Sequence, residues 1–462
     1  MVRPMPALPR IAARLAPATA AITILLLPAI WNRFALLEWD TGGYLARWYE
    51  GTLVPSRSTT YGLFLAASAP LQFWPALVLQ AAAAVWLVAL VLRVHQFPAQ
   101  RFALPVIIAA LSAVTALPWL ASVLLTDIFA GLAVLALHIL VCLPDRVSSR
   151  ERLGLVLFIG FAGSTHSGTY AVLLGLILVA LVASWCMPAL VPRATLAHGV
   201  AAIVLGAVFL LAGNYIVAKR IAWTPGGYGI AFARMLQDGI VTRYLNDHCP
   251  DPRLRLCPYR NELPLDADEF LWGQSVFDKL GRFKGLGDEM RTIVLGSLRD
   301  YPGMQIKAAL IATAKQLVTV GTGEGINANM WHTYGIIKDR TPYNLAAMRA
   351  AHQQHDDLKF NLIDKIHIPV AWAAMALLPF LILLGWRNAA FADLAILASS
   401  IALALLGNAA ICGIISNPHD RYGSRIVWIA ALAVALATWR IAGLARHRLA
   451  RVAAAASSPA PS

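Results

Sequence analysis

The sequence predicts an all-α membrane protein that crosses the bilayer about ten times and carries one soluble region between its seventh and eighth spans. Three observations lead to this prediction. Hydrophobic residues make up 59% of the 462 residues and charged residues only 13%, where a soluble domain has about 25%. Many apolar runs approach the roughly 20 residues that a spanning helix needs. Arginines also gather at alternate ends of these runs, as the positive-inside rule describes.

The apolar runs define the predicted spans. The first is too long for a cleavable signal peptide and no small-residue cleavage site follows it, so we expect it to be the first transmembrane helix. Residues 61–70 are expected to form a re-entrant or interfacial segment. The predicted spans are 15–37, 71–92, 103–122, 126–143, 153–163, 168–186, 198–218, 368–386, 391–415 and 426–440.

Charge placement predicts the orientation of these spans. Arg3, Arg10 and Arg14 precede the first one, which places the N-terminus in the cytoplasm. The outer turns near 123–126 and 164–167 then carry no Lys or Arg. The cytoplasmic connections and tail carry Arg93, Arg101, Arg146, Arg150, Arg152, Arg193, Arg387, Arg440, Arg446, Arg448 and Arg451.

Four arginines break this rule and are candidates for function: Arg47, Arg57, Arg421 and Arg425 all fall outside. The net charge of +14 could also suggest nucleic-acid binding. We exclude a nucleic-acid partner because the arginines are scattered between apolar runs and form no basic stripe.

The spans divide the chain into four parts. Residues 1–218 form an N-terminal transmembrane module whose first outer loop is 38–70. Residues 219–366 form a mainly helical extracytoplasmic domain, with Asp266 or Asp268 as a helix cap and a helix break at Tyr301–Pro302. Residues 367–445 form the C-terminal transmembrane helices, and 446–462 are expected to be a disordered basic cytoplasmic tail.

Two cysteines lie in the predicted outside domain. Cys249 and Cys257 flank a short Pro-rich loop, and an oxidising compartment favours a disulfide between them. The alternative is a pair of free thiols. No Cys/His spacing matches a structural zinc site.

The topology brings several polar residues to the outer surface. They are Glu38, Asp40, Arg57, Tyr61, Asp127, His166, His419, Asp420, Arg421, Tyr422 and Arg425. Polar groups at membrane depth usually face a cavity and serve function. The pair Gly42–Gly43 beside Asp40 permits close backbone approach. Aromatic neighbours, such as Tyr44, offer a stacking surface.

Each of these residues also has a structural interpretation. Asp127 could cap a helix, His166 could belong to a turn, and Glu38 could be an ordinary interfacial acid. Arg421 and Arg425 could anchor lipid headgroups. Taken together, however, a carboxylate can accept a proton from an acceptor hydroxyl, and guanidinium groups bind phosphate. This combination suits sugar transfer from a lipid-linked phosphosugar.

Five short motifs carry a resemblance to a known family. "EWD" at 38–40 resembles the modified DXD signature of the GT-C membrane glycosyltransferases. "SRSTTYGLFLAAS", "LLTDIFAGL", "SLRDYPGMQIKAALIATAKQLV" and "HDRYGSRIVW" resemble later segments of that family, in the same order. The family pattern has a Pro-Tyr-Pro-like turn where this chain has Thr60, Tyr61 and Gly62, and the proline expected after Arg421–Tyr422 is missing.

The resemblance is to bacterial polyprenyl-phosphate-dependent transferases of the aminoarabinose or lipopolysaccharide-sugar type. It implies an inner-membrane enzyme with cytoplasmic termini and a periplasmic site. The enzyme would move a sugar from a polyprenyl-phosphate donor to an envelope glycan, lipid or protein. Asp40 would be the base, Asp127 the second acid, and Arg57 and Arg421 the phosphate-side arginines.

Other interpretations of the sequence also remain open. An ExD pair, Glu38 and Asp40, could hold a divalent cation, although other members of the family work without one. A transporter or flippase of a lipid-linked substrate would instead need charged or broken helices at the membrane midplane and a repeat between halves. A non-catalytic assembly protein is a third hypothesis for the function.

Overall fold

The structure is a computed structural model and describes residues 7–53, 55–97, 102–187 and 193–456. Within these ranges it is helical, without β-strands, and a single isolated bridge joins Leu36 and Val123. Arg3 and Arg101, which enter the charge argument, lie outside the described residues.

In this part of the chain, six helices are long and apolar enough to cross a membrane by length and composition. They are α5 (Trp74–Val94), α10 (Ser167–Cys186), α11 (Arg193–Ala218), α20 (Phe360–Arg387), α21 (Ala392–Ile415) and α22 (Asp420–Ala456). The fold class is therefore that of a helical membrane protein, while the count of ten spans stays a prediction.

The other predicted spans are helical but shorter. They correspond to α1 (Ala7–Leu25), α2 (Leu27–Asn32), α6 (Ala103–Val114), α7 (Leu117–Ser122), α8 (Ile128–Cys142) and α9 (Ser149–Thr165). Prolines explain the two interruptions, since Pro28 and Pro118 each stand at the start of a helix, where a missing N–H costs least. The α8 helix is buried all round except at its last residue, so it forms the centre of the bundle and contacts α5, α9, α11, α21 and α22.

Two helices between α2 and α5 cover one end of this bundle. They are α3 (Trp39–Glu50) and α4 (Thr59–Ser68), which pack against each other. The predicted interfacial segment 61–70 thus falls mainly in α4. A methyl group at Gly42 would lie 2.7 Å from the Cα of Thr333, so glycine is needed where α3 meets α18 (Trp331–Arg340).

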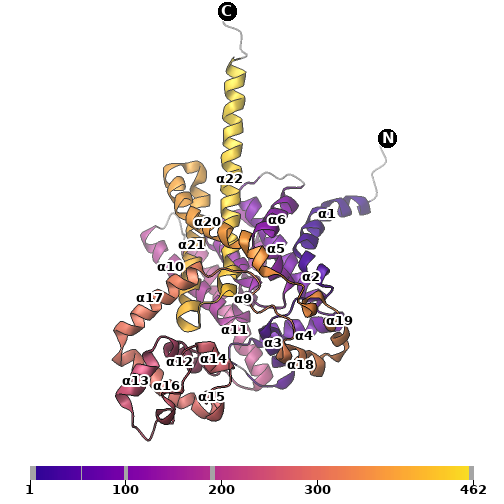
Figure 1. Cartoon of the computed structure of the whole chain (residues 1–462). Coiled ribbons are helices and arrows are strands. Elements are labelled where there is room, and N and C mark those ends of the chain that lie inside the picture. Colours follow the sequence, from indigo (N-terminus) through magenta and orange to yellow (C-terminus); the bar gives the residue numbers. More distant parts are fainter. Residues whose placement is uncertain (1–6, 54, 98–101, 188–192, 457–462) are drawn as a thin grey trace, which may run out of the picture.

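The region 219–366 divides between two hydrophobic cores. One core belongs to α12 (Gly227–Gln237), α13 (Ile240–His248), α14 (Ala267–Trp272), α15 (Val276–Lys279) and α16 (Arg282–Asp300). The later helices α17 (Pro302–Val318), α18 and α19 (Leu345–Arg349) follow it, and buried residues of α18 and α19 belong to the core of the bundle. Figure 1 shows α12 to α16 gathered at one end of the molecule and α22 projecting at the opposite end.

Several local predictions for this region can be compared with the structure. Asp266 accepts hydrogen bonds from the N–H groups of Asp268 and Glu269 and caps α14, and the helix break falls at Tyr301 as expected. Cys249 and Cys257 form a disulfide with a Cα–Cα distance of 5.6 Å.

The C-terminal tail differs from its prediction. The tail was expected to be disordered from 446, but α22 continues through Ala456. Its run of alanines, the best helix formers, explains the extension. Residues 457–462 lie outside the described part of the chain.

The remaining elements are single turns of 3-10 helix. They are η1 (Ala69–Leu71), η2 (Pro144–Arg146), η3 (Cys257–Tyr259), η4 (Pro342–Asn344), η5 (His352–His355) and η6 (Ala389–Phe391).

Candidate active site

Two acids and two arginines form a closed group of ion pairs where α3 and α22 begin. Arg421 donates from Nη1 to Glu38 Oε1 and from Nη2 to Asp40 Oδ2, each over 2.8 Å. Arg57 donates from Nη2 to the other oxygen of Asp40. The side chains of Asp40, Arg57 and Arg421 are 13%, 17% and 18% exposed, so they are largely desolvated but not sealed. We call Glu38, Asp40, Arg57 and Arg421 the charged quartet.

Local structure places each member of the quartet. Glu38 is the N-cap of α3, where its side chain accepts from the N–H of Asp40 and completes a capping box with Thr41. Arg57 crosses α3 over Gly43, where an added methyl group would lie 3.2 Å from its Nε, and its guanidinium lies 5.6 Å from the Tyr44 ring centroid. The small Gly43 therefore makes room for the arginine to reach Asp40.

The loop between α17 and α18 holds the start of α22. Glu324 accepts a hydrogen bond from the backbone N–H of Arg421 over 2.9 Å, and Asp420 accepts one from the N–H of Gly321 over 2.6 Å. Gly325 has φ +79°, and a methyl group there would lie 2.3 Å from Oε1 of Glu38. A glycine is thus needed for the loop to rest directly on the quartet.

A histidine connects this loop to the separate core of α12–α16. His419 Nδ1 lies 2.7 Å from Glu324, and its Nε2 lies 3.3 Å from Asp268 of α14. Burial alone would lower the pKa of His419, but its hydrogen bonds to Asp268 and Glu324 raise that pKa to about 10. The imidazole is therefore charged at neutral pH and links two acids from different parts of the chain.

One helical turn beyond Arg421, Arg425 forms a deeper polar layer. It is fully buried and donates to Asn408, while its Nη1 lies 3.4 Å from Asp127 and 3.2 Å from His166 Nδ1. The second oxygen of Asp127 is buried without a hydrogen-bond partner in the described part of the chain. The ring of Tyr422 lies beside both arginines, with its centroid 5.1 Å and 5.3 Å from their guanidinium carbons.

The two carboxylates of the quartet differ in protonation. Burial would raise the pKa of Asp40, but the charges of Arg57 and Arg421 outweigh burial and lower that pKa to about 2. Burial, followed by the charge of Asp40, raises the pKa of Glu38 to about 8 against the opposing effect of Arg421. The quartet therefore contains one firmly ionised acid and one that titrates near neutral pH.

The structure brings together ten of the eleven residues that the sequence places at this surface. The exception is Tyr61, which is buried among aromatic rings and donates from its hydroxyl to Gln80 over 3.0 Å. Its ring packs between α4 and the bundle. A tyrosine ring is well suited to a hydrophobic core when its hydroxyl has a hydrogen-bond partner, which Gln80 provides here.

The structure also bears on the alternative interpretations. Asp127 precedes α8 but makes no side-chain cap hydrogen bond, and it pairs with Arg425 instead. Arg425 is fully buried, which is inconsistent with anchoring to lipid headgroups, whereas Arg421 is partly exposed and pairs with Glu38 and Asp40. His166 does cap α10, accepting from Thr169 N–H, in addition to facing Arg425. Glu38 is 4% exposed, so it is not an ordinary interfacial acid.

Sequence reasoning missed Glu324 and the role of Asp268. Glu324 stands in "GTGEGIN", and a lone acid between glycines in a soluble loop is the only signal that could have drawn attention to it. Its contacts with His419 and Arg421 join segments far apart in the chain, which no local pattern reports.

A divalent cation does not fit between Glu38 and Asp40 in this arrangement. Their oxygens face the guanidinium groups of Arg57 and Arg421, which a metal ion would have to displace. Groups of three or more His, Cys, Asp or Glu side chains suited to a metal are absent from the residues that the structure describes.

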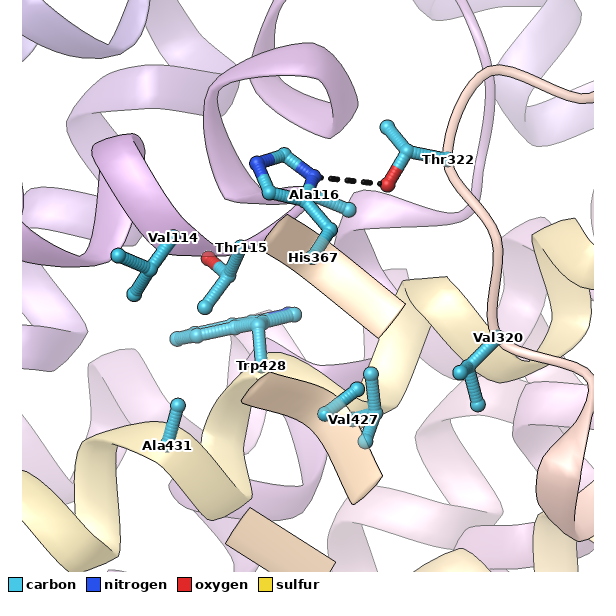
Figure 2. Close-up of a pocket in the computed structure, with 10 residues that line it drawn as sticks. Val114, Thr115, Ala116, Val320, Thr322, His367, Val427, Trp428 and Ala431 are labelled. Carbon is cyan, nitrogen blue, oxygen red and sulfur yellow. Dashed lines mark hydrogen bonds between the residues drawn. The ribbon is translucent and has the colours of Figure 1, made fainter. Parts of the chain in front are cut away.

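A cavity of about 10 Å³ lies farther along α22, away from the quartet. Figure 2 shows the face of Trp428 on one side and His367, hydrogen-bonded to Thr322 over 2.9 Å, on another. This volume is about that of one water probe. The cavity is too small for a substrate, so the charged quartet is the candidate site.

Comparisons of the chain with protein-family models, curated proteins and solved structures found no significant match.

Proposed function

We propose that this chain is an inverting glycosyltransferase that moves a sugar from a polyprenyl-phosphate donor to an envelope glycan, lipid or protein acceptor. The reaction would take place on the extracytoplasmic face of the bacterial inner membrane. The observation that carries this proposal is the convergence of Asp40 at the start of α3, Arg57 just before α4 and Arg421 at the start of the apolar helix α22.

The position of the quartet suits such a donor. Its members stand at the start of α3, before α4 and at the start of α22, where apolar helices give way to polar loops. A polyprenyl-phosphate sugar has its tail in the bilayer, its phosphate at the surface and its sugar in water. Two guanidinium groups at this depth can bind the phosphate through paired N–H donors.

The proposed reaction uses these groups directly. The acceptor oxygen forms a bond to the anomeric carbon while the bond from that carbon to the phosphate oxygen breaks. Asp40 accepts the proton that leaves the acceptor hydroxyl. Arg57 and Arg421 stabilise the charge that develops on the departing polyprenyl phosphate. Asp127 and Arg425 form a buried ion pair beneath the site that keeps α22 in place.

A transporter or flippase is less well supported. Such a protein would need charges near the middle of its spanning helices. The described ion pairs that involve the spanning helices lie near helix ends instead, around Arg421 and Arg425 at one end and around Asp393 at the other. This distribution favours a surface reaction over passage through the bundle.

The test is transfer of labelled sugar from a polyprenyl-phosphate donor by the full-length protein in nanodiscs. Arg57→Ala and Arg421→Ala should weaken donor binding and transfer, and the Lys variants should lose less, since Lys keeps the charge but not the planar fork. Arg47→Ala is the matched control because Arg47 lies on α3, the helix that carries Asp40, but pairs with Glu50. Equal activity in Arg421→Ala and Arg47→Ala would contradict the proposal.

A further inference from the structure

The arginines and the base of the proposed reaction are bound to one another in this structure. Arg421 donates one amino group to Glu38 and the other to Asp40, and Arg57 donates to the second oxygen of Asp40. Both oxygens of Asp40 are therefore engaged by cations. A base needs a free oxygen, and an arginine that binds phosphate needs free donors.

We propose that Asp40 occupies the donor-phosphate position on Arg57 and Arg421 in the ligand-free protein, and that the donor phosphate displaces it, so that the base is released only when donor is bound. This inference rests on the proposed function. It makes the Asp40 ion pairs an autoinhibitory contact that sets the order of binding, with donor before acceptor.

The exchange is chemically balanced. Carboxylate and phosphate both accept paired N–H donors from guanidinium, so one anion replaces another and no arginine is left unpaired. Glu38 keeps its hydrogen bond to Arg421 and holds that guanidinium while Asp40 leaves. The ring of Tyr44 lies against Arg57 and steadies it in the same way.

The released carboxylate gains basicity because it loses two positive neighbours. Burial raises the pKa of Asp40, while Arg57 and Arg421 lower it to about 2, so loss of the arginines leaves an acid better able to accept a proton. After transfer, Asp40 holds the acceptor proton. It returns that proton to water and pairs with the arginines again when polyprenyl phosphate departs.

The deeper arginine is not part of this exchange. Arg425 donates to Asn408 and is fully buried, whereas Arg57 and Arg421 are each partly exposed. A phosphate entering from the membrane surface therefore meets Arg57 and Arg421 first.

The experiment measures binding of polyprenyl phosphate, without any sugar, to the full-length protein in nanodiscs. Asp40→Asn and Asp40→Ala remove the internal competitor and should bind this lipid about tenfold more tightly than wild type. Asp393→Asn, which removes another arginine-paired aspartate at the opposite end of the bundle, should bind it like wild type. Gel filtration and thermal unfolding identify the folded variants.

The outcomes separate the two proposals. Equal or weaker binding by folded Asp40→Asn and Asp40→Ala, with wild type binding and Arg421→Ala not, overturns the displacement and leaves the proposed donor in place. Binding of the lipid by neither wild type nor any variant overturns the proposed donor and the displacement together.

Discussion

Arg421, in the first turn of α22, and Arg440, farther along the same helix, each pair with an aspartate, but the two clusters are built differently. At the end of the bundle opposite the quartet, Arg440 pairs with Asp393, which also contacts His95 over 2.9 Å and Arg146 over 4.0 Å. At the other end, Arg421 is shared between Glu38 and Asp40. We call His95, Arg146, Asp393 and Arg440 the far-end cluster.

The partners of the two arginines explain what each cluster can do. Arg440 also donates to two backbone carbonyls, those of Ala390 over 2.9 Å and His95 over 2.7 Å. Backbone acceptors cannot move without moving their helices, so this arginine ties α5, α21 and α22 together. The guanidinium of Arg421 instead donates to side-chain carboxylates, which a ligand can replace. The far-end cluster therefore suits structural support, and the charged quartet suits the exchange of one anion for another.

The two clusters are expected to lie on opposite sides of a membrane. A measurement of membrane topology tests this expectation with a yes-or-no result. Reporter fusions at residue 260, next to α14, and at residue 148, next to the far-end cluster, should report opposite compartments. The alternation of arginines along the chain is the reason for this expectation. Signals from the same compartment would remove the proposed extracytoplasmic site.

The largest graded effect is expected for Asp40→Asn. The substitution keeps the shape of the side chain and removes the proton acceptor. A positioned base contributes about 100- to 10,000-fold, so transfer of labelled sugar should fall by a factor in that range. Glu38→Gln should be milder, because Glu38 positions Arg421 and accepts no proton in the proposed reaction. Transfer at the wild-type rate by Asp40→Asn would refute the mechanism.

Removing a charge from the far-end cluster should lower the stability of the protein and leave its transfer rate nearly unchanged. Asp393→Asn should lower the free energy of unfolding by about 2 kcal/mol, since it leaves Arg440 without its charged partner in a partly buried setting. Its transfer rate should stay close to wild type. Unfolding in detergent is the measurement, with the exposed Asp356→Asn as the control. A variant that keeps full stability but loses transfer would reverse the assignment of the two clusters.

A change of one pH unit should have a smaller effect on stability than Asp393→Asn. The pKa of Glu38 is raised to about 8 in the folded protein, so folding takes up a proton between about pH 5 and pH 8. The free energy of unfolding should therefore decrease as the pH rises through this window, by at most about 1.4 kcal/mol per pH unit. Asp40, with its pKa lowered to about 2, stays ionised throughout and adds no slope.

Glu38→Gln should lose this part of the slope, because glutamine does not titrate. The exposed Glu262→Gln should keep it. Unfolding measured at pH 5, 6.5 and 8 compares the two variants with wild type. Equal slopes for Glu38→Gln and wild type would show that another group is responsible.

The predicted side of the membrane on which each arginine lies was the best guide to the site. Of the four arginines predicted to lie outside, against the positive-inside rule, Arg57, Arg421 and Arg425 converge on the acids. The fourth, Arg47, pairs locally with Glu50 and with backbone carbonyls nearby. A misplaced charge thus indicates a buried partner, but it does not distinguish a local partner from a distant one.

Other features could not be predicted because they depend on packing between distant segments. The contacts of Glu324 with His419 and Arg421 appear only once the loop before α18 folds over α22. The division of 219–366 between two cores depends on which amphipathic faces meet, and a single helix face does not identify its partner. The apolar runs do predict where most helices are, although the last part of the first run, residues 33–37, is not helical.

The distance along α22 between Arg421 and Arg440 determines how deep the site lies relative to the lipid. The stretch between Arg421 and Arg440 is about 28 Å long at 1.5 Å per residue, close to the roughly 30 Å hydrocarbon thickness of a bilayer. Ion pairs at both ends fix this rod against the neighbouring helices, so it cannot slide to suit a thinner or thicker membrane. Hydrophobic mismatch would then be met by tilting of the whole bundle. Lipid acyl-chain length should therefore change how deep the headgroups lie relative to Arg421.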